Sequence, residues 1–188
     1  MDLSELERLL NRRSRVRIPS EGRPIAAVLI GLFGPPPDYK IVYTVRTSHV
    51  EHHKGEISFP GGGKDPEDAT LVETALRESF EEVGIEPDDI TVLGLMDDIV
   101  TRSKFVVTPV VARIQRDPYP FIPQAREVDK VLEVPLSHLR DPRNLAPHPD
   151  DPTGQRIKIQ SYRFGEHMIW GATAHMTNRF LDLLKPLF

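Results

Sequence analysis

The sequence contains no cysteine among its 188 residues. This absence excludes disulfide bonds, thiolate nucleophiles and zinc sites built on cysteine. Long hydrophobic runs are also missing, because the longest extends only from Ile25 to Phe33, whereas a membrane-spanning helix needs roughly 20 apolar residues. The amphipathic, charged stretch over residues 1–17 lacks the apolar core and small-residue cleavage site of a secretory signal. We therefore expect a cytoplasmic protein that does not enter a membrane.

Charge of one sign is not in excess either. The chain carries 24 basic and 28 acidic side chains, for a net charge of −4. Such a balance gives no broad field that would draw the protein onto nucleic acid or an anionic membrane. Hydrophobic residues make up 39% of the chain. This is enough to build a core, so we do not expect a disordered chain. The length favours a single domain over residues 1–188.

The spacing of apolar residues predicts a mixture of helices and strands. Helices are expected over about residues 3–13, 68–83 and 173–184. Strands are expected over residues 24–30, 40–46, 90–94, 104–114 and 130–135, and the first two should form a hairpin. A further hairpin is expected from residues 156–164 and 168–170, whereas residues 47–67, rich in His, Gly and Pro, are expected to be a loop. This order indicates an α+β fold with a mixed central sheet covered by helices.

The second expected helix carries an acidic cluster. Glu78 and Glu82 lie four residues apart, so their carboxylates leave the same face of the helix, and Glu81 lies beside them. Like charges at this spacing repel by a few tenths of a kcal/mol per pair, and Arg77, which can reach Glu81, cannot neutralise all three. A hard divalent cation with oxygen ligands, such as Mg²⁺, can. The alternative is an ordinary solvated helix face, because glutamate is a common surface residue and a good helix former.

The residues before and after this cluster favour a site. The run from Phe59 to Lys64 contains three consecutive glycines, which permit close approach of the backbone to a phosphate. Asp68 stands where the helix should begin and is expected to cap it. Gly84 is expected to end the helix. A glycine-rich loop followed by an acidic helix suits a phosphate-handling metal site better than a bare acidic surface.

Residues 62–85 resemble the Nudix box, which is a glycine, five residues, a glutamate, seven residues and then R-E-U-x-E-E-x-G-U, with U apolar. The second half matches at Arg77, Glu78, Glu81, Glu82, Gly84 and Ile85, with Ser79 in place of an apolar residue. Asp68 stands at the first acidic position, and eight residues rather than seven separate it from Arg77. The resemblance implies a Nudix-type α/β/α sandwich with the Nudix loop-helix, and Mg²⁺, with Mn²⁺ as an alternative, held by Glu78, Glu81 and Glu82.

Residues 42–62 resemble the additional signature of the coenzyme A diphosphatase branch, L-L-T-x-R-[SA]-x-x-x-R-x-x-x-G-x-x-x-F-P-G-G. The matching positions are Thr44, Arg46, Gly55, Phe59, Pro60, Gly61 and Gly62. Thr47 replaces a small residue, and Glu51 replaces the second arginine. The resemblance implies a pyrophosphatase that splits coenzyme A or its acyl derivatives into adenosine 3′,5′-bisphosphate and 4′-phosphopantetheine. Because an anion at Glu51 would repel phosphate where arginine would bind it, ADP-ribose, NADH or a dinucleoside polyphosphate is the alternative substrate.

The expected reaction is attack of water on a phosphorus of the diphosphate. The water's proton would go to Glu81 or to Glu127, and the sequence does not decide between them. Arg77 is expected to orient the glutamates through charge-assisted hydrogen bonds. The candidates for substrate binding are Arg46, His53, Gly61, Gly62 and Lys64. The alternatives are a surface salt bridge for Arg46, and polar or exposed loop positions for His53 and Glu127.

One rival belongs to a different class, a Nudix-fold binding module without turnover. The intact set of Glu78, Glu81 and Glu82 argues against it, since a binder has no need of a metal cluster. The expected partner is a small nucleotide-derived molecule, and a homodimer is the expected assembly if one forms. Asp97 and Asp98 are expected to be loop acids, because their spacing indicates no metal site.

Overall fold

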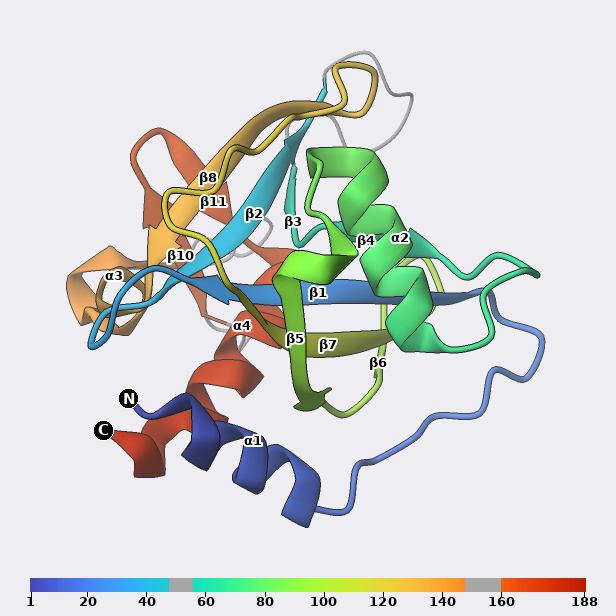
Figure 1. Cartoon of the computed structure of the whole chain (residues 1–188), viewed down its shortest axis with the longest axis horizontal. Coiled ribbons are helices and arrows are strands. Elements are labelled where there is room, and N and C mark those ends of the chain that lie inside the picture. Colours follow the sequence, from blue (N-terminus) through green and yellow to red (C-terminus); the bar gives the residue numbers. More distant parts are fainter. Residues whose placement is uncertain (48–55, 148–159) are drawn as a thin grey trace.

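The computed structural model describes residues 1–47, 56–147 and 160–188. Its helices and strands follow the expected order closely (Figure 1). The helices are α1 (Leu3–Arg12), α2 (Leu71–Val83), α3 (Leu136–Arg140) and α4 (Gly171–Leu184), with short 3₁₀ turns at Pro87–Asp89, Pro142–Asn144 and Lys185–Leu187. The strands are β1 (Ile25–Phe33), β2 (Lys40–Arg46), β3 (Ile57–Ser58), β4 (Gly61–Gly63), β5 (Ile90–Leu95), β6 (Ile99–Val100), β7 (Val106–Ile114), β8 (Val128–Pro135), β9 (Leu145–Ala146), β10 (Ser161–Phe164) and β11 (His167–Ile169).

The main sheet is mixed, as the sequence predicts. Its strands run in the order β3-β2-β1-β7-β5, with β4 also paired to β1, β6 to β7 and β8 to β2. The pairing of β1 with β7 is parallel, whereas the other pairings of this sheet are antiparallel. The expected hairpin of β1 and β2 is confirmed. The later hairpin is confirmed for β10 and β11, although residues 156–159 of the expected strand lie outside the described ranges.

The side chains of β1 alternate between two layers. Ala26, Ile30 and Leu32 pack into a core that also contains residues of α1 and α4. Leu29 and Phe33 pack instead into a core that contains residues of α2. This alternation follows from the two-residue period of a strand. Both faces of the sheet are therefore covered, and the expected α/β/α sandwich is confirmed (Figure 1).

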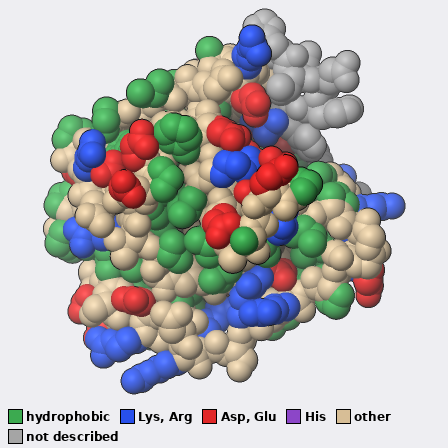
Figure 2. All heavy atoms as spheres, turned by 45° about the vertical axis from the view of Figure 1, so that its right-hand side comes forward, with side chains coloured by type: hydrophobic (Ala, Val, Ile, Leu, Met, Phe, Trp, Pro, Cys, Tyr) green, Lys and Arg blue, Asp and Glu red, His purple; other side chains and the backbone are tan. Residues whose placement is uncertain are grey.

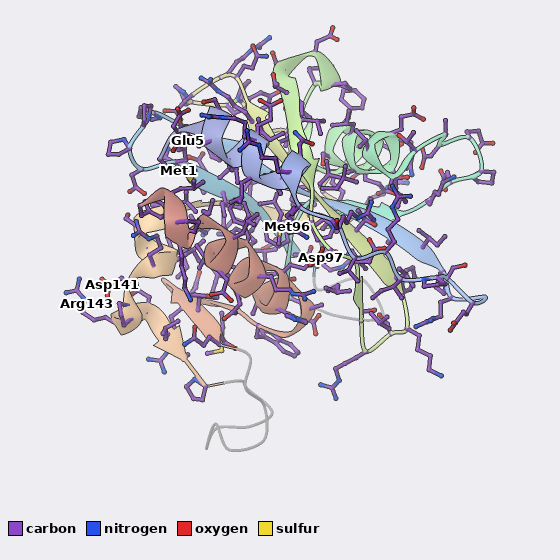
Figure 3. The ribbon with its side chains drawn as sticks, turned by 90° about the horizontal axis from the view of Figure 1, so that it is seen from below. Met1, Glu5, Met96, Asp97, Asp141 and Arg143 are labelled. Carbon is purple, nitrogen blue, oxygen red and sulfur yellow. The ribbon has the colours of Figure 1, made fainter. Side chains whose placement is uncertain are left out.

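The face opposite α2 is covered by α1 and α4, which Figure 3 shows from below. Leu3, Leu6 and Leu10 of α1 are buried against it, as is Phe180 of α4. This layer therefore closes the core on the far side of the sheet from the acidic helix.

None of the helices in the described ranges is long and apolar enough to cross a membrane.

The strands β1 and β2 separate along their length. They pair at Leu32–Ile41 and Phe33–Lys40, and beyond this point β2 pairs with β3 while β1 pairs with β4. The prediction that residues 47–67 form a loop is therefore wrong for β3 and β4. Three glycines carry no apolar alternation, so a pattern of side chains cannot reveal a strand that is set by backbone pairing alone.

The beginning of α2 also differs from the prediction. Thr70, not Asp68, is the N-cap: Glu73 N donates to Thr70 Oγ1 at 3.1 Å and Thr70 N donates to Glu73 Oε2 at 3.3 Å. This reciprocal pair satisfies two free amides of the first turn. The helix ends as predicted at Gly84, which has a left-handed φ of 70°, a conformation that suits a residue without a Cβ.

Asp98 lies in the loop between β5 and β6, as the sequence predicts, but it is not an exposed side chain there. Its side chain is buried and accepts hydrogen bonds from Arg15, from Thr108 Oγ1 and from Ile18 N. The contacts with Arg15 and Ile18 join positions about 80 residues apart, so local spacing gives no sign of them. Asp98 fastens the segment after α1 to the sheet.

Candidate active site

The glutamates of α2 differ in their exposure to solvent. Glu82 is only 5% exposed, Glu78 is 17% exposed and Glu81 is 54% exposed at the side chain. Together with Gln124 and Glu127 they line a cavity of about 340 Å³. Figure 2 shows acidic and basic side chains intermixed on the side of the molecule that comes forward from the right of Figure 1. The structure thus brings the three glutamates of the motif together with a fourth carboxylate from a distant segment.

The glycines of β4 form the floor beneath these carboxylates. Gly61 N donates to Glu82 Oε2 at 3.1 Å. Gly61 has a φ of +149°, and a Cβ at this position would lie 2.4 Å from Ala27 O. A Cβ on Gly62 would lie 2.5 Å from the carboxyl carbon of Glu78. Gly61 is therefore needed for β4 to lie this close to β1, and Gly62 for the Glu78 carboxylate of α2 to approach β4, whatever their role toward phosphate.

Arg77 joins the loop before α2 to the glutamates. Its Nε and Nη2 donate to the two carboxylate oxygens of Asp68 at 3.0 and 2.9 Å, and Nη2 also donates to Gly63 O at 3.0 Å. Its Nη1 donates to Glu78 Oε1 at 3.0 Å and to Glu81 Oε2 at 3.2 Å. One guanidinium therefore fixes Asp68, Glu78 and Glu81 relative to one another, with the two-pronged geometry in which arginine binds carboxylate most strongly.

The same contacts set the ionisation of Asp68. The hydrogen bonds from Arg77 hold the pKa of this carboxyl well below its usual 3.8, against the opposing effect of burial. The same hydrogen bonds to Asp68 raise the pKa of Arg77. Thr74 Oγ1 and Asp65 N also donate to Asp68 Oδ2, at 2.9 and 3.0 Å. Asp68 is thus an ionised anchor for Arg77 and not a helix cap.

Burial has the opposite effect on the glutamates that line the cavity. It raises the pKa of Glu82 to about 7, with the charges of Glu78 and Glu127 adding to the rise and the Gly61 amide and Arg46 opposing it. Burial also raises the pKa of Glu78, against the hydrogen bond and charge of Arg77. Carboxylates gathered in this way are destabilised unless a positive charge enters.

The donor set fits a hard divalent cation. Glu78, Glu81, Glu82 and Glu127 line one cavity, and carboxylate oxygens are ligands that suit Mg²⁺ or Mn²⁺. Within the described part of the chain, no three acidic or histidine side chains converge as a ready-formed metal cage. Glu81 is turned toward Arg77, and binding an ion would require its carboxylate to turn inward. The assignment of Glu78, Glu81 and Glu82 as metal ligands stays a prediction.

Glu127 reaches the cavity from the segment before β8. Gln124 N donates to Glu82 O at 2.8 Å, which joins this segment to α2, and Glu127 N donates to Gln124 O at 2.9 Å. The sequence singles out Glu127 but not Gln124, which also lines the cavity. A neutral side chain in a loop carries no charge pattern or spacing by which it could be found.

Two of the remaining candidates for substrate binding, Arg46 and Lys64, lie within the described residues. Arg46 ends β2 at an irregularity between Val45 and Arg46, its charge acts on Glu82, and its buried Nε has no hydrogen-bond partner among the described residues. Lys64 Nζ donates to Asp68 O at 2.6 Å and so holds the loop before α2. His53, like Glu51, lies outside the described residues. The roles of these side chains toward substrate stay predictions.

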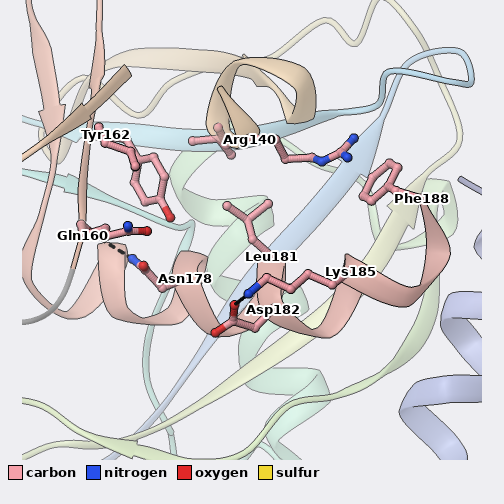
Figure 4. A pocket seen from close by; sticks show the side chains of 10 residues that line it. Arg140, Gln160, Tyr162, Asn178, Leu181, Asp182, Lys185 and Phe188 are labelled. Atoms are coloured by element: carbon pink, nitrogen blue, oxygen red, sulfur yellow. Dashed lines mark hydrogen bonds and ion pairs between the residues drawn. The ribbon is translucent and has the colours of Figure 1, made fainter. Parts of the chain in front are cut away.

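A second cavity, of about 330 Å³, lies between α3, β10 and α4 (Figure 4). The guanidinium of Arg140 lies 3.4 Å from the centre of the Phe188 ring. Lys185 Nζ forms an ion pair with Asp182 Oδ1 at 2.7 Å. The basic side chains around this hollow are therefore engaged with neighbours, and the carboxylate cavity beside α2 is the better candidate for catalysis.

The mixed sheet, the helices on both faces and the carboxylate helix over a glycine strand define the Nudix class of hydrolases. The chain belongs to the Nudix family: the NUDIX domain matches residues 22–154. It is 38% identical over 164 residues to the mitochondrial coenzyme A diphosphatase NUDT8 of Homo sapiens, covering 86% of this chain and 70% of that protein. It is 33% identical over 167 residues to the uncharacterized Nudix hydrolase NudL of Pectobacterium atrosepticum, covering 86% of each.

A solved structure supports the fold independently. The MutT/nudix family protein from Enterococcus faecalis matches with a TM-score of 0.56 at 14% identity, covering 100% of this chain and 75% of that one. At this level of identity the likeness concerns the fold alone. The prediction of a Nudix fold, and that of an enzyme of the Nudix hydrolase family, are confirmed.

Proposed function

We propose that this Nudix hydrolase is a divalent-metal-dependent diphosphatase whose substrate is coenzyme A or an acyl derivative of it. The products are adenosine 3′,5′-bisphosphate and 4′-phosphopantetheine. The observation that carries the proposal is the cavity in which Glu78, Glu81, Glu82 and Glu127 meet, in a chain 38% identical to a protein named as a coenzyme A diphosphatase. The partner that we propose is a small nucleotide-derived molecule.

Glu78, Glu81 and Glu82 would hold Mg²⁺ or Mn²⁺, which when bound supplies positive charge against the diphosphate and makes the attacking water more acidic. The oxygen of water forms a bond to one phosphorus while the bond from that phosphorus to the bridging oxygen breaks. The bridging oxygen leaves with the second phosphate. The water's proton passes to a carboxylate of the protein.

Glu127 is the better of the two candidate bases. The carboxylate of Glu81 already accepts a hydrogen bond from Arg77 at 3.2 Å, and the four-residue spacing keeps this contact within one helix. Glu127 faces the same cavity from another segment, near enough for its charge to act on Glu78 and Glu82. A base that is not itself needed as an ion ligand is free to accept a proton.

Arg46 is the side chain that we assign to the substrate's phosphate. It stands at the end of β2 beside Glu82 with an unpartnered, buried Nε. A phosphate oxygen would satisfy this donor, and arginine binds phosphate through paired hydrogen bonds. Lys64 and His53 are proposed as further phosphate contacts, and Gly61 and Gly62 as the backbone that approaches it.

Glu51 favours a second candidate substrate. It stands where the branch signature has arginine, and its charge opposes the 3′-phosphate that coenzyme A carries and that ADP-ribose and NADH lack. A dinucleoside polyphosphate belongs to the same alternative. The chemistry at Glu78 and Glu82 would be identical, so the alternative concerns recognition and not the reaction. A cytoplasmic location and a homodimer are further proposals from the sequence.

Glu82→Gln separates a hydrolase, which should lose most of its turnover, from a binding module, which should keep its affinity for its ligand. The substitution keeps the size of the side chain but removes its negative charge, so coenzyme A turnover with Mg²⁺ should fall by more than the roughly 10- to 100-fold that loss of a supporting group costs. Chelation of the metal with EDTA should abolish turnover by the unaltered protein, and added Mg²⁺ should restore it. Release of 4′-phosphopantetheine is the measurement, and turnover unaffected by Glu82→Gln would refute the assignment of this site.

A further inference from the structure

Thr47 lies directly after Arg46 at the end of β2 and is 4% exposed. Its backbone N donates to Glu127 O at 3.0 Å. Its hydroxyl Oγ1 donates to Arg126 O at 3.0 Å. One buried side chain with its own amide therefore holds two successive carbonyls of the segment that carries Glu127, although the two segments are 79 residues apart in sequence.

The opposite edge of the same peptide is held by Gln124. Glu127 N donates to Gln124 O at 2.9 Å, and Gln124 Oε1 accepts from Arg126 N at 2.8 Å. Arg126 O and Glu127 N belong to one peptide unit, so the bond from Thr47 and the bond to Gln124 O hold it from both edges. Gln124 N in turn donates to Glu82 O at 2.8 Å.

This arrangement connects three parts of the site through the backbone. Glu82 is on α2, Thr47 follows β2, and Glu127 precedes β8, where Arg46 pairs with Val128. The position of the Glu127 carboxylate across the cavity therefore depends on the peptide that Thr47 and Gln124 hold. A misplacement of about 1 Å in a catalytic group is enough to lower a rate about 100-fold.

We propose that Thr47 is a positioning residue, whose hydroxyl orients the Arg126–Glu127 peptide so that the Glu127 carboxylate faces the attacking water. The inference rests on the proposed function, in which Glu127 accepts the proton. Thr47 does not touch substrate and acts only through Glu127. Its contribution belongs to the rate of the chemical step and not to the affinity for the diphosphate.

The test compares Thr47→Val and Thr47→Ser, each in the unaltered protein and in Glu127→Gln. Thr47→Val keeps the shape of the side chain and removes the hydroxyl, whereas Thr47→Ser keeps the hydroxyl. Thr177→Val is the matched control, because Thr177 is also buried and also donates to a backbone carbonyl, Thr173 O at 2.9 Å, on the α4 side of the sheet. For each protein, kcat and KM for coenzyme A with Mg²⁺ and the thermal unfolding midpoint are measured.

We expect Thr47→Val to lower kcat by about 10-fold or more, within the range that a displaced base allows, with little change in KM. Thr47→Ser should restore kcat, and Thr177→Val should leave it unchanged while lowering the unfolding midpoint. In the Glu127→Gln background Thr47→Val should have no further effect on kcat, because residues that act as one unit are not additive.

The inference is overturned if Thr47→Val leaves kcat unchanged, if it lowers kcat equally in the Glu127→Gln background, or if Glu127→Gln is itself fully active. Failure of the proposed substrate is a separate result. If the unaltered protein ignores coenzyme A but splits ADP-ribose or NADH, the same variants are compared on that substrate and the inference about Thr47 is tested there. A protein that splits none of these diphosphates overturns both.

Discussion

At the scale of single residues, two buried carboxyls of the site, those of Asp68 and Glu82, have pKa values shifted in opposite directions by their surroundings. Asp68 is buried and bound on both oxygens by Arg77, which keeps its pKa low. Glu82 is also buried, but with one backbone donor and like charges nearby, and its pKa rises to about 7. The pair of Asp68 and Arg77 stabilises the loop before α2. The excess negative charge around Glu82 instead favours the binding of a cation.

Asp68→Asn should therefore weaken the fold and the site together. It removes the paired charge on Arg77, so we expect a lower free energy of unfolding near neutral pH and reduced turnover. Because the folded-state pKa of Asp68 lies below its usual 3.8, its stabilising effect is present above that value and is lost as the pH falls through the lowered pKa. The difference in unfolding free energy between the two proteins, measured by denaturant titration, should shrink below about pH 4. A difference that grows in acid would contradict this account.

The sequence predicts the site residues that lie close together along the chain, but of those that reach the cavity from the segment before β8 it singles out Glu127 and misses Gln124. The spacing of Glu78, Glu81 and Glu82 places them on one helix turn, and the i to i+4 contact of Arg77 with Glu81 is present. The roles of Gln124 and Thr47 could not be predicted, because they depend on backbone contacts between distant segments. Asp68 could be recognised at the first acidic position of the motif. Only the structure shows that it binds Arg77 and does not cap the helix.

At the scale of elements, the site is built where β4 lies under α2. The helix is fixed at its start by the capping pair of Thr70 and Glu73 and stopped at Gly84. Ser79, which departs from the apolar residue of the motif, is buried in α2 and donates to Ala75 O at 2.6 Å. Its hydroxyl is thus satisfied within the helix, so the departure does not disturb the contact of α2 with the sheet.

The three glycines of β4 should respond differently to alanine. At Gly61 the added Cβ meets the backbone of Ala27 and Val28 at 2.4 and 2.5 Å, which cannot yield cheaply, so Gly61→Ala should lower the unfolding midpoint clearly. At Gly62 the three atoms nearest the Cβ all belong to the carboxylate of Glu78, a flexible end, so Gly62→Ala should fold but lose most of its turnover. Gly63→Ala is the control, because nothing lies within 4 Å of its Cβ. Equal turnover for Gly62→Ala and Gly63→Ala would contradict the close packing of Glu78.

The elements themselves were largely predictable from the sequence. The helices α1, α2 and α4 and the long strands follow the apolar pattern because each buries one face against the sheet, and their ends are confirmed to within a few residues, whereas the short helix α3 was not predicted. The short strands β3 and β4 could not be predicted, since they exist only because β1 and β2 separate and leave backbone groups to pair. Strand β4, which lies beneath the carboxylates of the site, is thus an element that the apolar pattern could not predict.

At the scale of the whole molecule, the sheet separates the layer of α1 and α4 from the layer that holds the candidate active site. The leucines of α1 and the apolar side of α4 occupy one core, and α2 with Ile85 and Tyr119 occupies the other. The carboxylate cavity lies on the α2 side. Changes in the layer of α1 and α4 should therefore alter stability without altering the chemistry.

Leu6→Ala tests this separation. Leu6 is fully buried in α1, and removal of a buried leucine side chain costs about 2–5 kcal/mol of unfolding free energy. We expect a loss in this range by denaturant titration, with kcat unchanged at temperatures where the protein stays folded. Val16→Ala, at a position 58% exposed, should change stability by no more than about 0.5 kcal/mol. A fall in kcat for folded Leu6→Ala would show that the two layers are coupled.

In the proposed function, the diphosphate of coenzyme A is split in the cavity beside α2. The most direct measurement is mass spectrometry of the products after incubation with Mg²⁺ and an equimolar mixture of coenzyme A, acetyl-coenzyme A, ADP-ribose, NADH and diadenosine polyphosphates. We expect that 4′-phosphopantetheine, or its acylated form, and adenosine 3′,5′-bisphosphate are released first, and that Glu82→Gln suppresses their release. Preferential release of AMP from ADP-ribose or NADH would contradict the proposed substrate and point to the charge of Glu51 as the cause.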